Sequence, residues 1–188
     1  MKEITFNSIE GMRIGNSQKL SGPTGCTVLI FENGAPAGVD VRGGSPGTRE
    51  TDLLNPVNLV DRIHAVVLAG GSAFGLDAAG GVMQYLEEKN IGFDVSVTKV
   101  PIVCGAVLFD LNIGDFRIRP SKSMGYEACK NSELNLCENG NVGAGAGATV
   151  GKIFGNEHAM KGGLGTFAIQ VGDLKVGAVV AVNCLGDV

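Results

Sequence analysis

The segment spanning residues 64–89 constrains the fold more than any other part of the chain. It begins with a continuous apolar run, residues 66–68, of the kind found in a strand buried on both faces. A glycine-rich turn over residues 69–75 follows. Beyond it, apolar residues recur at helical spacing: Leu76, Ala79, Val82, Met83 and Leu86. A strand that passes through a glycine turn into an amphipathic helix predicts an α/β core, with backbone N–H groups at the turn free to meet a ligand.

Ser72 lies in this turn, where some serine hydrolases carry their nucleophile. Their nucleophile elbow requires the pattern Gly-x-Ser-x-Gly, and position 74 of this chain is Phe. Ser72 is therefore expected to cap the helix or to line a site rather than to attack a substrate.

Composition excludes several classes of function. The chain has 188 residues, 44% of them hydrophobic, with 30 Gly and no Trp, which predicts one domain with tight turns and closely packed backbone. The net charge is −4 and no basic cluster occurs, so neither nucleic acid nor an anionic membrane is an expected partner. No long apolar run and no signal peptide are found, which makes the cytoplasm the expected location.

Cysteine and histidine usage argues against metal and disulfide chemistry. The five cysteines are scattered and never form Cys-x-x-Cys, a pattern that fits reduced thiols. The two histidines, His64 and His158, have no partner at metal-ligand spacing, so neither a zinc site nor any cofactor is predicted. His64 precedes a buried strand and is expected to be structural.

The first half of the chain shows further strand and loop signals. Residues 25–31 predict a strand, and the Asn-Gly pair within residues 32–34 predicts a hairpin turn into a return strand over residues 37–41. The polar, glycine-rich loop at residues 42–50 suits either ligand binding or a solvated connection. Residues 56–62 are expected to form a short helix.

The second half predicts one helix and a final hairpin. Residues 123–130 should form a short helix with Met124, Ala128 and Cys129 inward. Residues 162–171 and 174–183 read as two strands around a Gly-Asp turn. Because the chain stops soon after this last strand, we expect it to be the front part of a longer protein or one product of a cleavage.

The Gly-Ala-rich segment over residues 141–152 invites comparison with phosphate-binding motifs. A P-loop needs Gly where Ala146 stands and Ser or Thr where Ile153 stands, so that motif is broken twice. A relaxed dinucleotide pattern fits the spacing, but polar residues rather than a strand precede it. The small residues are expected instead to pack close to another backbone.

Several segments in series point to one family. They are Gly-Pro-Thr-Gly-Cys-Thr at 22–27, Val-Asp-Val-Arg-Gly-Gly at 39–44, Leu-Ala-Gly-Gly-Ser-Ala-Phe-Gly-Leu at 68–76, Val-Pro-Ile-Val at 100–103, Phe-Asp at 109–110, and residues 140–152 and 179–187. Together they resemble the DmpA-like family of self-processing N-terminal-nucleophile hydrolases, which includes L-aminopeptidase/D-esterases, β-aminopeptidases and nylon-oligomer hydrolases.

The resemblance implies an α/β fold of a particular kind. It is the four-layer α-β-β-α sandwich of the DmpA/ornithine acetyltransferase type, expected to be incomplete in this chain. Members of the family cut their own chain, and the new N-terminal Ser or Thr becomes the nucleophile. In the nylon-oligomer hydrolases this Thr lies in an Asn-Thr-Thr segment that these 188 residues lack. Residues 1–188 are thus expected to be a single, α-subunit-like domain that needs a C-terminal β-like segment.

The resemblance also assigns roles to a few residues. Asn183 corresponds to the asparagine that helps hold the oxyanion, although a strand-end Asn that caps a turn is the structural alternative. Lys152 corresponds to an active-site lysine of the nylon-hydrolase branch, which the aminopeptidase branch lacks. Phe109 replaces a tyrosine found in both branches, which removes a hydroxyl donor. Phe109, Ser72 and Gly71 are expected to line the substrate pocket.

The function implied is a self-processing amidohydrolase or aminopeptidase that acts on small amides or peptides as a homo-oligomer. The isolated chain, lacking the nucleophile, is expected to be inactive. Two alternatives remain open. In the first, the chain is a scaffold or binding protein that lost catalysis; in the second, Cys184 becomes the nucleophile after cleavage between Asn183 and Cys184.

Overall fold

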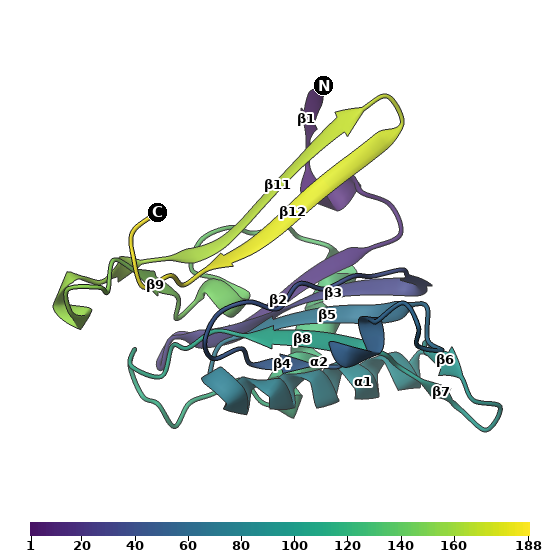
Figure 1. The fold of residues 1–188 in the computed structure, drawn as a ribbon, viewed down its shortest axis with the longest axis horizontal. Coiled ribbons are helices and arrows are strands. Elements are labelled where there is room, and N and C mark those ends of the chain that lie inside the picture. Colours follow the sequence, from purple (N-terminus) through teal and green to yellow (C-terminus); the bar gives the residue numbers. More distant parts are fainter.

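The computed structural model describes residues 1–188 and contains two stacked β-sheets with two helices on one side (Figure 1). The larger sheet has five strands in the order β2-β3-β5-β8-β4. Its strands are β2 (Arg13–Lys19), β3 (Thr24–Ala35), β4 (Thr48–Arg49), β5 (Ile63–Ala69) and β8 (Val103–Val107). The β5–β8 pair is parallel, and the other pairs are antiparallel.

The smaller sheet has three antiparallel strands in the order β1-β11-β12. They are β1 (Lys2–Ile4), β11 (Gly163–Val171) and β12 (Leu174–Val182). Gly172 takes a φ of +58° in the turn between β11 and β12, a conformation that glycine adopts without steric cost. The predicted final hairpin is confirmed.

The helices α1 (Ala78–Glu88) and α2 (Lys122–Asn131) lie side by side on the face of the five-stranded sheet that points away from the smaller sheet (Figure 1). The layers are therefore helix, sheet and sheet, which are three of the four layers expected. No helix covers the outer face of the three-stranded sheet. None of the helices is both long and apolar enough to span a lipid bilayer.

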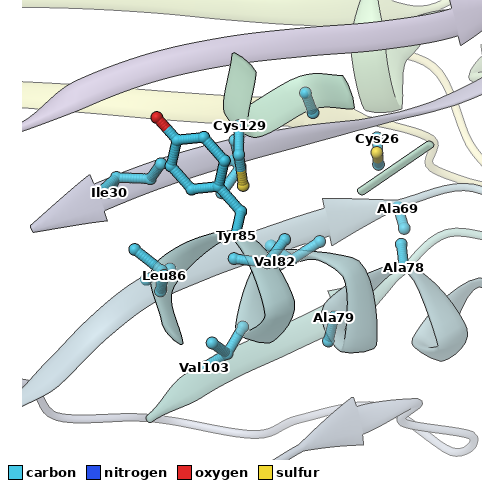
Figure 2. Packing of buried hydrophobic residues seen from close by; sticks show 14 of the residues in the cluster. Cys26, Ile30, Ala69, Ala78, Ala79, Val82, Tyr85, Leu86, Val103 and Cys129 are labelled. Carbon is cyan, nitrogen blue, oxygen red and sulfur yellow. The ribbon is translucent and has the colours of Figure 1, made fainter. Parts of the chain in front are cut away.

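The main core fills the space between the helices and the five-stranded sheet (Figure 2). Val82, Tyr85 and Leu86 of α1 are all buried there, and each such side chain stabilises the fold by roughly 1.5–3 kcal/mol. Met124, Ala128 and Cys129 of α2 are buried too, as predicted. A smaller cluster of Phe6, Ile14 and Ala168 joins the two sheets.

The predicted strand, glycine turn and helix at residues 64–89 are confirmed with one refinement. After β5, a 3-10 helix (Ser72–Asp77) precedes α1. Ser72 does not cap a helix, because Gly71 holds the cap position and no side-chain capping bond forms. Val66 and Leu68 are half-buried rather than fully buried, since the smaller sheet covers only part of that face.

Two predicted elements of the first half are wrong. No return strand forms over residues 37–41, because β3 continues to Ala35 and reaches Ile63 of β5 across a register shift. The register shift is a β-bulge, and Gly34, with φ +68°, lies in this bulge rather than in a hairpin turn. Residues 56–62 are not helical either. The side-chain amide of Asn58 donates to Asp52 O at 2.7 Å. This bond stabilises a turn in place of a helix.

The remaining elements are short. Two small two-stranded sheets pair β6 (Phe93–Asp94) with β7 (Lys99–Val100) and β9 (Thr149–Val150) with β10 (Met160–Lys161). Further 3-10 turns occupy Phe6–Ser8, Asp52–Leu54, Ser132–Leu134, Gly143–Gly145 and Asn156–His158. His64 is buried and its Nδ1 accepts the Ile102 N–H at 3.2 Å, and burial lowers the pKa of the imidazole. The structural role expected for His64 is supported by this bond.

Candidate active site

Lys152 and Asn183 lie in direct contact, although 31 positions separate them in the chain. Asn183 follows β12 and Lys152 follows β9. The Lys152 Nζ donates to Asn183 Oδ1 at 3.0 Å, to the Asn183 carbonyl at 3.3 Å and to the Thr149 carbonyl at 2.8 Å. An ammonium group has three hydrogens, so these contacts use its full donor capacity. Burial lowers the pKa of Lys152, and the nearby Cys184 opposes that shift.

The side-chain amide of Asn183 is held at both ends. Its Oδ1 accepts from the Thr149 N–H at 2.9 Å as well as from Lys152, and its Nδ2 donates to the Phe109 carbonyl at 2.8 Å. Because two donors face the oxygen and an acceptor faces the nitrogen, the amide has only one favourable orientation. The second Nδ2 hydrogen makes no hydrogen bond within the chain.

The predicted pocket residues lie at the carboxyl ends of the parallel strands β5 and β8. Leu108 N donates to Ala69 O at 2.8 Å and Ser72 N donates to Leu108 O at 2.9 Å, so the backbone after β8 runs beside the turn after β5. Phe109 thus contacts Asn183 through its carbonyl, while the residue as a whole is 56% exposed. Gly71 and Ser72 connect to the segment after β8 and make no direct bond to Asn183 or Lys152.

Asp110 is a buried carboxylate that sequence analysis did not single out as a site residue. Its Oδ1 accepts from the Gly71 N–H at 2.6 Å, and its Oδ2 accepts from the Thr24 hydroxyl at 2.7 Å. The available signal was its place directly after an apolar strand, in a segment that already carried the family resemblance.

The Gly-Ala segment packs against backbone, as predicted. A Cβ added at Gly143 would collide with Thr27, and one added at Gly145 would collide with the backbone of β11. The Ala144 N–H also donates to Thr27 Oγ1 at 3.0 Å. The segment therefore anchors the chain between β3 and β11 before it reaches Thr149 and Lys152.

Cys184 is half-buried beside the Lys152–Asn183 pair. Its Sγ contacts the Gly186 carbonyl at 3.1 Å. The residues after Cys184 pair with the backbone around Lys152. Gly151 N donates to Gly186 O at 2.6 Å, and Lys152 N donates to Leu185 O at 2.7 Å. The thiol thus points along the backbone that follows it.

Solved structures with the same architecture define the class of fold. The chain superposes on an L-aminopeptidase D-Ala-esterase/amidase from Ochrobactrum anthropi with a TM-score of 0.73 at 17% identity, over 96% of this chain and 53% of that one. A β-aminopeptidase from Burkholderia sp. gives a TM-score of 0.72 at 18% identity, over 96% and 52%. The expected DmpA-type fold class is confirmed.

The sequence places the chain in a family. The model of peptidase family S58 matches residues 5–187, and the chain belongs to that family. It is 44% identical to an uncharacterized aminopeptidase of Mycobacterium leprae, over 100% of this chain and 54% of that protein. It is 31% identical to a 6-aminohexanoate-oligomer endohydrolase of Agromyces sp., over 98% and 49%. The chain thus spans about half the length of these relatives.

Proposed function

We propose that residues 1–188 form the α-like part of a self-processing amidohydrolase or aminopeptidase that acts on small amides or peptides. The observation that carries this proposal is the Asn183 amide, which is fixed at both ends and keeps one N–H unused. A preorganised donor of this kind stabilises the oxyanion of an acyl-transfer intermediate and is typically worth 10²–10³-fold, or about 3–4 kcal/mol, in kcat. Family membership and the names of the relatives support the same class of reaction.

Lys152 supports this donor in the proposed mechanism. It fixes the Asn183 oxygen, so the free N–H of Nδ2 keeps its direction. Its positive charge would also lower the pKa of an amine placed nearby, because a second positive charge is unfavourable at short range. An N-terminal amine with a lowered pKa is a better base at neutral pH.

The nucleophile is proposed to come from a segment beyond these 188 residues. Self-cleavage there would expose an N-terminal Ser or Thr whose hydroxyl attacks the substrate carbonyl. Its own α-amine would take the hydroxyl proton and pass it to the leaving amine, which departs as an ester forms. Water would then hydrolyse the ester to the acid. The length of the relatives, about twice that of this chain, supports such a segment. The complete protein is proposed to work as a homo-oligomer in the cytoplasm.

Phe109 favours a second candidate function, that of a scaffold or binding protein without catalysis. The phenyl ring offers no hydroxyl donor, and Phe109 is exposed. The contact that the structure uses, however, is the backbone carbonyl of Phe109, which any residue at this position supplies. The amidohydrolase is therefore the better supported of the two.

The test uses the product of the complete gene. Intact-mass analysis shows whether and where the chain is cut, and hydrolysis of amino-acyl anilides and of linear 6-aminohexanoate oligomers measures activity. We expect cleavage before a Ser or Thr, and Asn183→Ala to lower kcat by about 10²-fold or more. The matched control Asn112→Ala removes an exposed amide that bonds only Asn156 and should leave kcat unchanged.

The outcomes separate the alternatives. A protein that folds and assembles but is never cut and never hydrolyses an amide would support the scaffold. Cleavage directly after Asn183, with activity abolished in Cys184→Ala, would identify the thiol as the nucleophile.

A further inference from the structure

Asp110 is a buried acidic residue that has no partner in a salt bridge. It is 3% exposed and forms no ion pair with any Lys, Arg or His. Its carboxylate is satisfied by two neutral donors, the Gly71 N–H and the Thr24 hydroxyl. Burying a carboxylate is costly even when it is hydrogen-bonded, so such a group needs a structural or functional reason.

Two glycines make room for this carboxylate. A Cβ added at Gly70 would collide with Asp110 Oδ2, and one added at Gly147 would lie 2.6 Å from the same oxygen. Together with Thr24 and Gly71, these residues come from three separate segments: the start of β3, the turn after β5 and the Gly-Ala segment before β9. The carboxylate therefore sits at the point where the three segments meet.

Two of the groups that hold the Asn183 amide lie in segments that contact Asp110. The acceptor of its Nδ2 is the carbonyl of Phe109, the residue directly before Asp110. The backbone donor to its Oδ1 is Thr149, two residues after Gly147. A displacement of Asp110 would thus move the partners at both ends of the amide.

We propose that Asp110 is a positioning residue that fixes the direction of the free Asn183 N–H by locking the segments that carry Phe109 and Thr149. The proposal rests on the function proposed above, in which that N–H meets the oxyanion. Asp110 itself touches no substrate. It acts through the geometry of Asn183, because a small displacement of an oxyanion donor lowers the reaction rate strongly.

The chemistry of the two donors predicts how variants rank. A carboxylate accepts from both donors at once. In Asp110→Asn one oxygen still accepts from Gly71, and the new amide N–H can donate to Thr24 Oγ1 if that hydroxyl rotates. In Asp110→Ala both donors lose their partner and a cavity forms. We therefore expect the Asn variant to retain much of the wild-type kcat and the Ala variant to lose about 10–100-fold, each with KM within about twofold.

A double-mutant cycle in the full-length protein separates positioning from a general loss of structure. If Asp110 acts through Asn183, Asp110→Ala should lower kcat strongly in the wild type and little in the Asn183→Ala background. Equal losses in both backgrounds, or an unchanged kcat in Asp110→Ala, would overturn the proposal. Asp115→Ala, which removes a partly exposed carboxylate paired with Arg117, serves as the control and should change neither constant.

Crystal structures of the same variants provide a readout independent of activity. In Asp110→Ala the Asn183 Nδ2–Phe109 O distance, 2.8 Å in the wild type, should lengthen beyond hydrogen-bonding range. A distance that stays at 2.8 Å would contradict the proposal even if the wild-type protein hydrolyses no amide. Should Asp110→Ala fail to fold, Thr24→Val removes one of the two donors at nearly constant volume and tests the same distance and the same cycle.

Discussion

At the scale of single residues, the hydrogen bonds of the candidate site depend on whether Lys152 is protonated. Only the ammonium form can donate to all three oxygens that surround Nζ. Burial lowers the pKa of this lysine below its ordinary value of 10.5, so in the folded protein the proton leaves at a lower pH than in the unfolded chain. Between the folded and the unfolded pKa the unfolded state binds more protons. This group therefore makes stability rise with pH in that window, while its hold on Asn183 weakens.

We predict that kcat of the full-length protein falls in an alkaline range that begins below pH 10.5, the ordinary pKa of lysine. Lys152→Met should have a lower kcat throughout and should lack this alkaline fall. The measurement is a pH profile of kcat, with urea unfolding over the same range. Lys130→Met, at an exposed position on α2, is the control. An alkaline fall that persists in Lys152→Met would assign the titration to another group.

At the scale of elements, the turn after β5 depends on a glycine. Gly71 has a φ of +79°, and a Cβ there would lie 2.8 Å from Pro120 Cδ. We predict that Gly71→Val lowers the free energy of unfolding by about 3 kcal/mol or more, because a β-branched residue strains this backbone and also collides with the proline. Gly165→Val, in a strand with open space around the added atoms, should change stability little. Chemical denaturation measures both, and equal losses would refute the importance assigned to this turn.

Two adjacent glycines of α1 should respond in opposite directions. A Cβ at Gly81 would collide with the Lys122 carbonyl of α2, whereas one at Gly80 would meet only the Lys122 side chain at 3.9 Å. We predict that Gly80→Ala stabilises the protein by about 0.5–1 kcal/mol through helix propensity. Gly81→Ala should destabilise it by more than that, because the two helix backbones must separate. Thermal unfolding of the pair measures the contrast, and stabilisation by both substitutions would show that α1 and α2 pack less closely.

Elements with purely local signals were predictable from the sequence. Two such cases are the β11–β12 hairpin and the strand, turn and helix at residues 64–89. Each combines an apolar pattern with a glycine at its own turn. The return strand predicted at 37–41 was wrong, because a glycine with a positive φ such as Gly34 suits a bulge as well as a hairpin, and long-range pairing with Ile63 decides between them. Asp110 was missed for a related reason. The space that Gly70 and Gly147 leave for its carboxylate exists only after distant segments meet.

At the scale of the whole molecule, the outer face of the three-stranded sheet carries exposed apolar side chains. Cross-strand pairs place Phe167, Val171, Leu174, Val176 and Val180 on that face, all of them exposed. The four-layer fold that the family resemblance implies would cover such a face with helices, and this chain spans about half the length of its relatives. The exposed face is therefore consistent with the further segment proposed above.

We predict that the 188-residue chain alone binds a hydrophobic dye, self-associates and hydrolyses no amide, because the proposed oxyanion donor lies on this chain and the proposed nucleophile on a further segment. Supplying the downstream segment, in the same chain or as a second subunit, should lower dye binding and establish activity. Light scattering, dye fluorescence and anilide hydrolysis measure these properties. Efficient hydrolysis by the isolated chain, abolished in Cys184→Ala, would show that the thiol is the nucleophile.

The bonds around Asn183 also determine when in folding this site can exist. Its partners lie 34 and 74 positions away in the chain: Thr149 is in β9, and Phe109 follows β8 of the five-stranded sheet. Contacts of such long range require large loops to close before any bond forms, so the amide is held only after segments distant in the chain have met. The geometry of one amide thereby depends on how the end of β12, β9 and the segment after β8 are placed relative to one another. A chain in which helices and strands have formed but these segments have not yet met would leave the Asn183 amide without its partners.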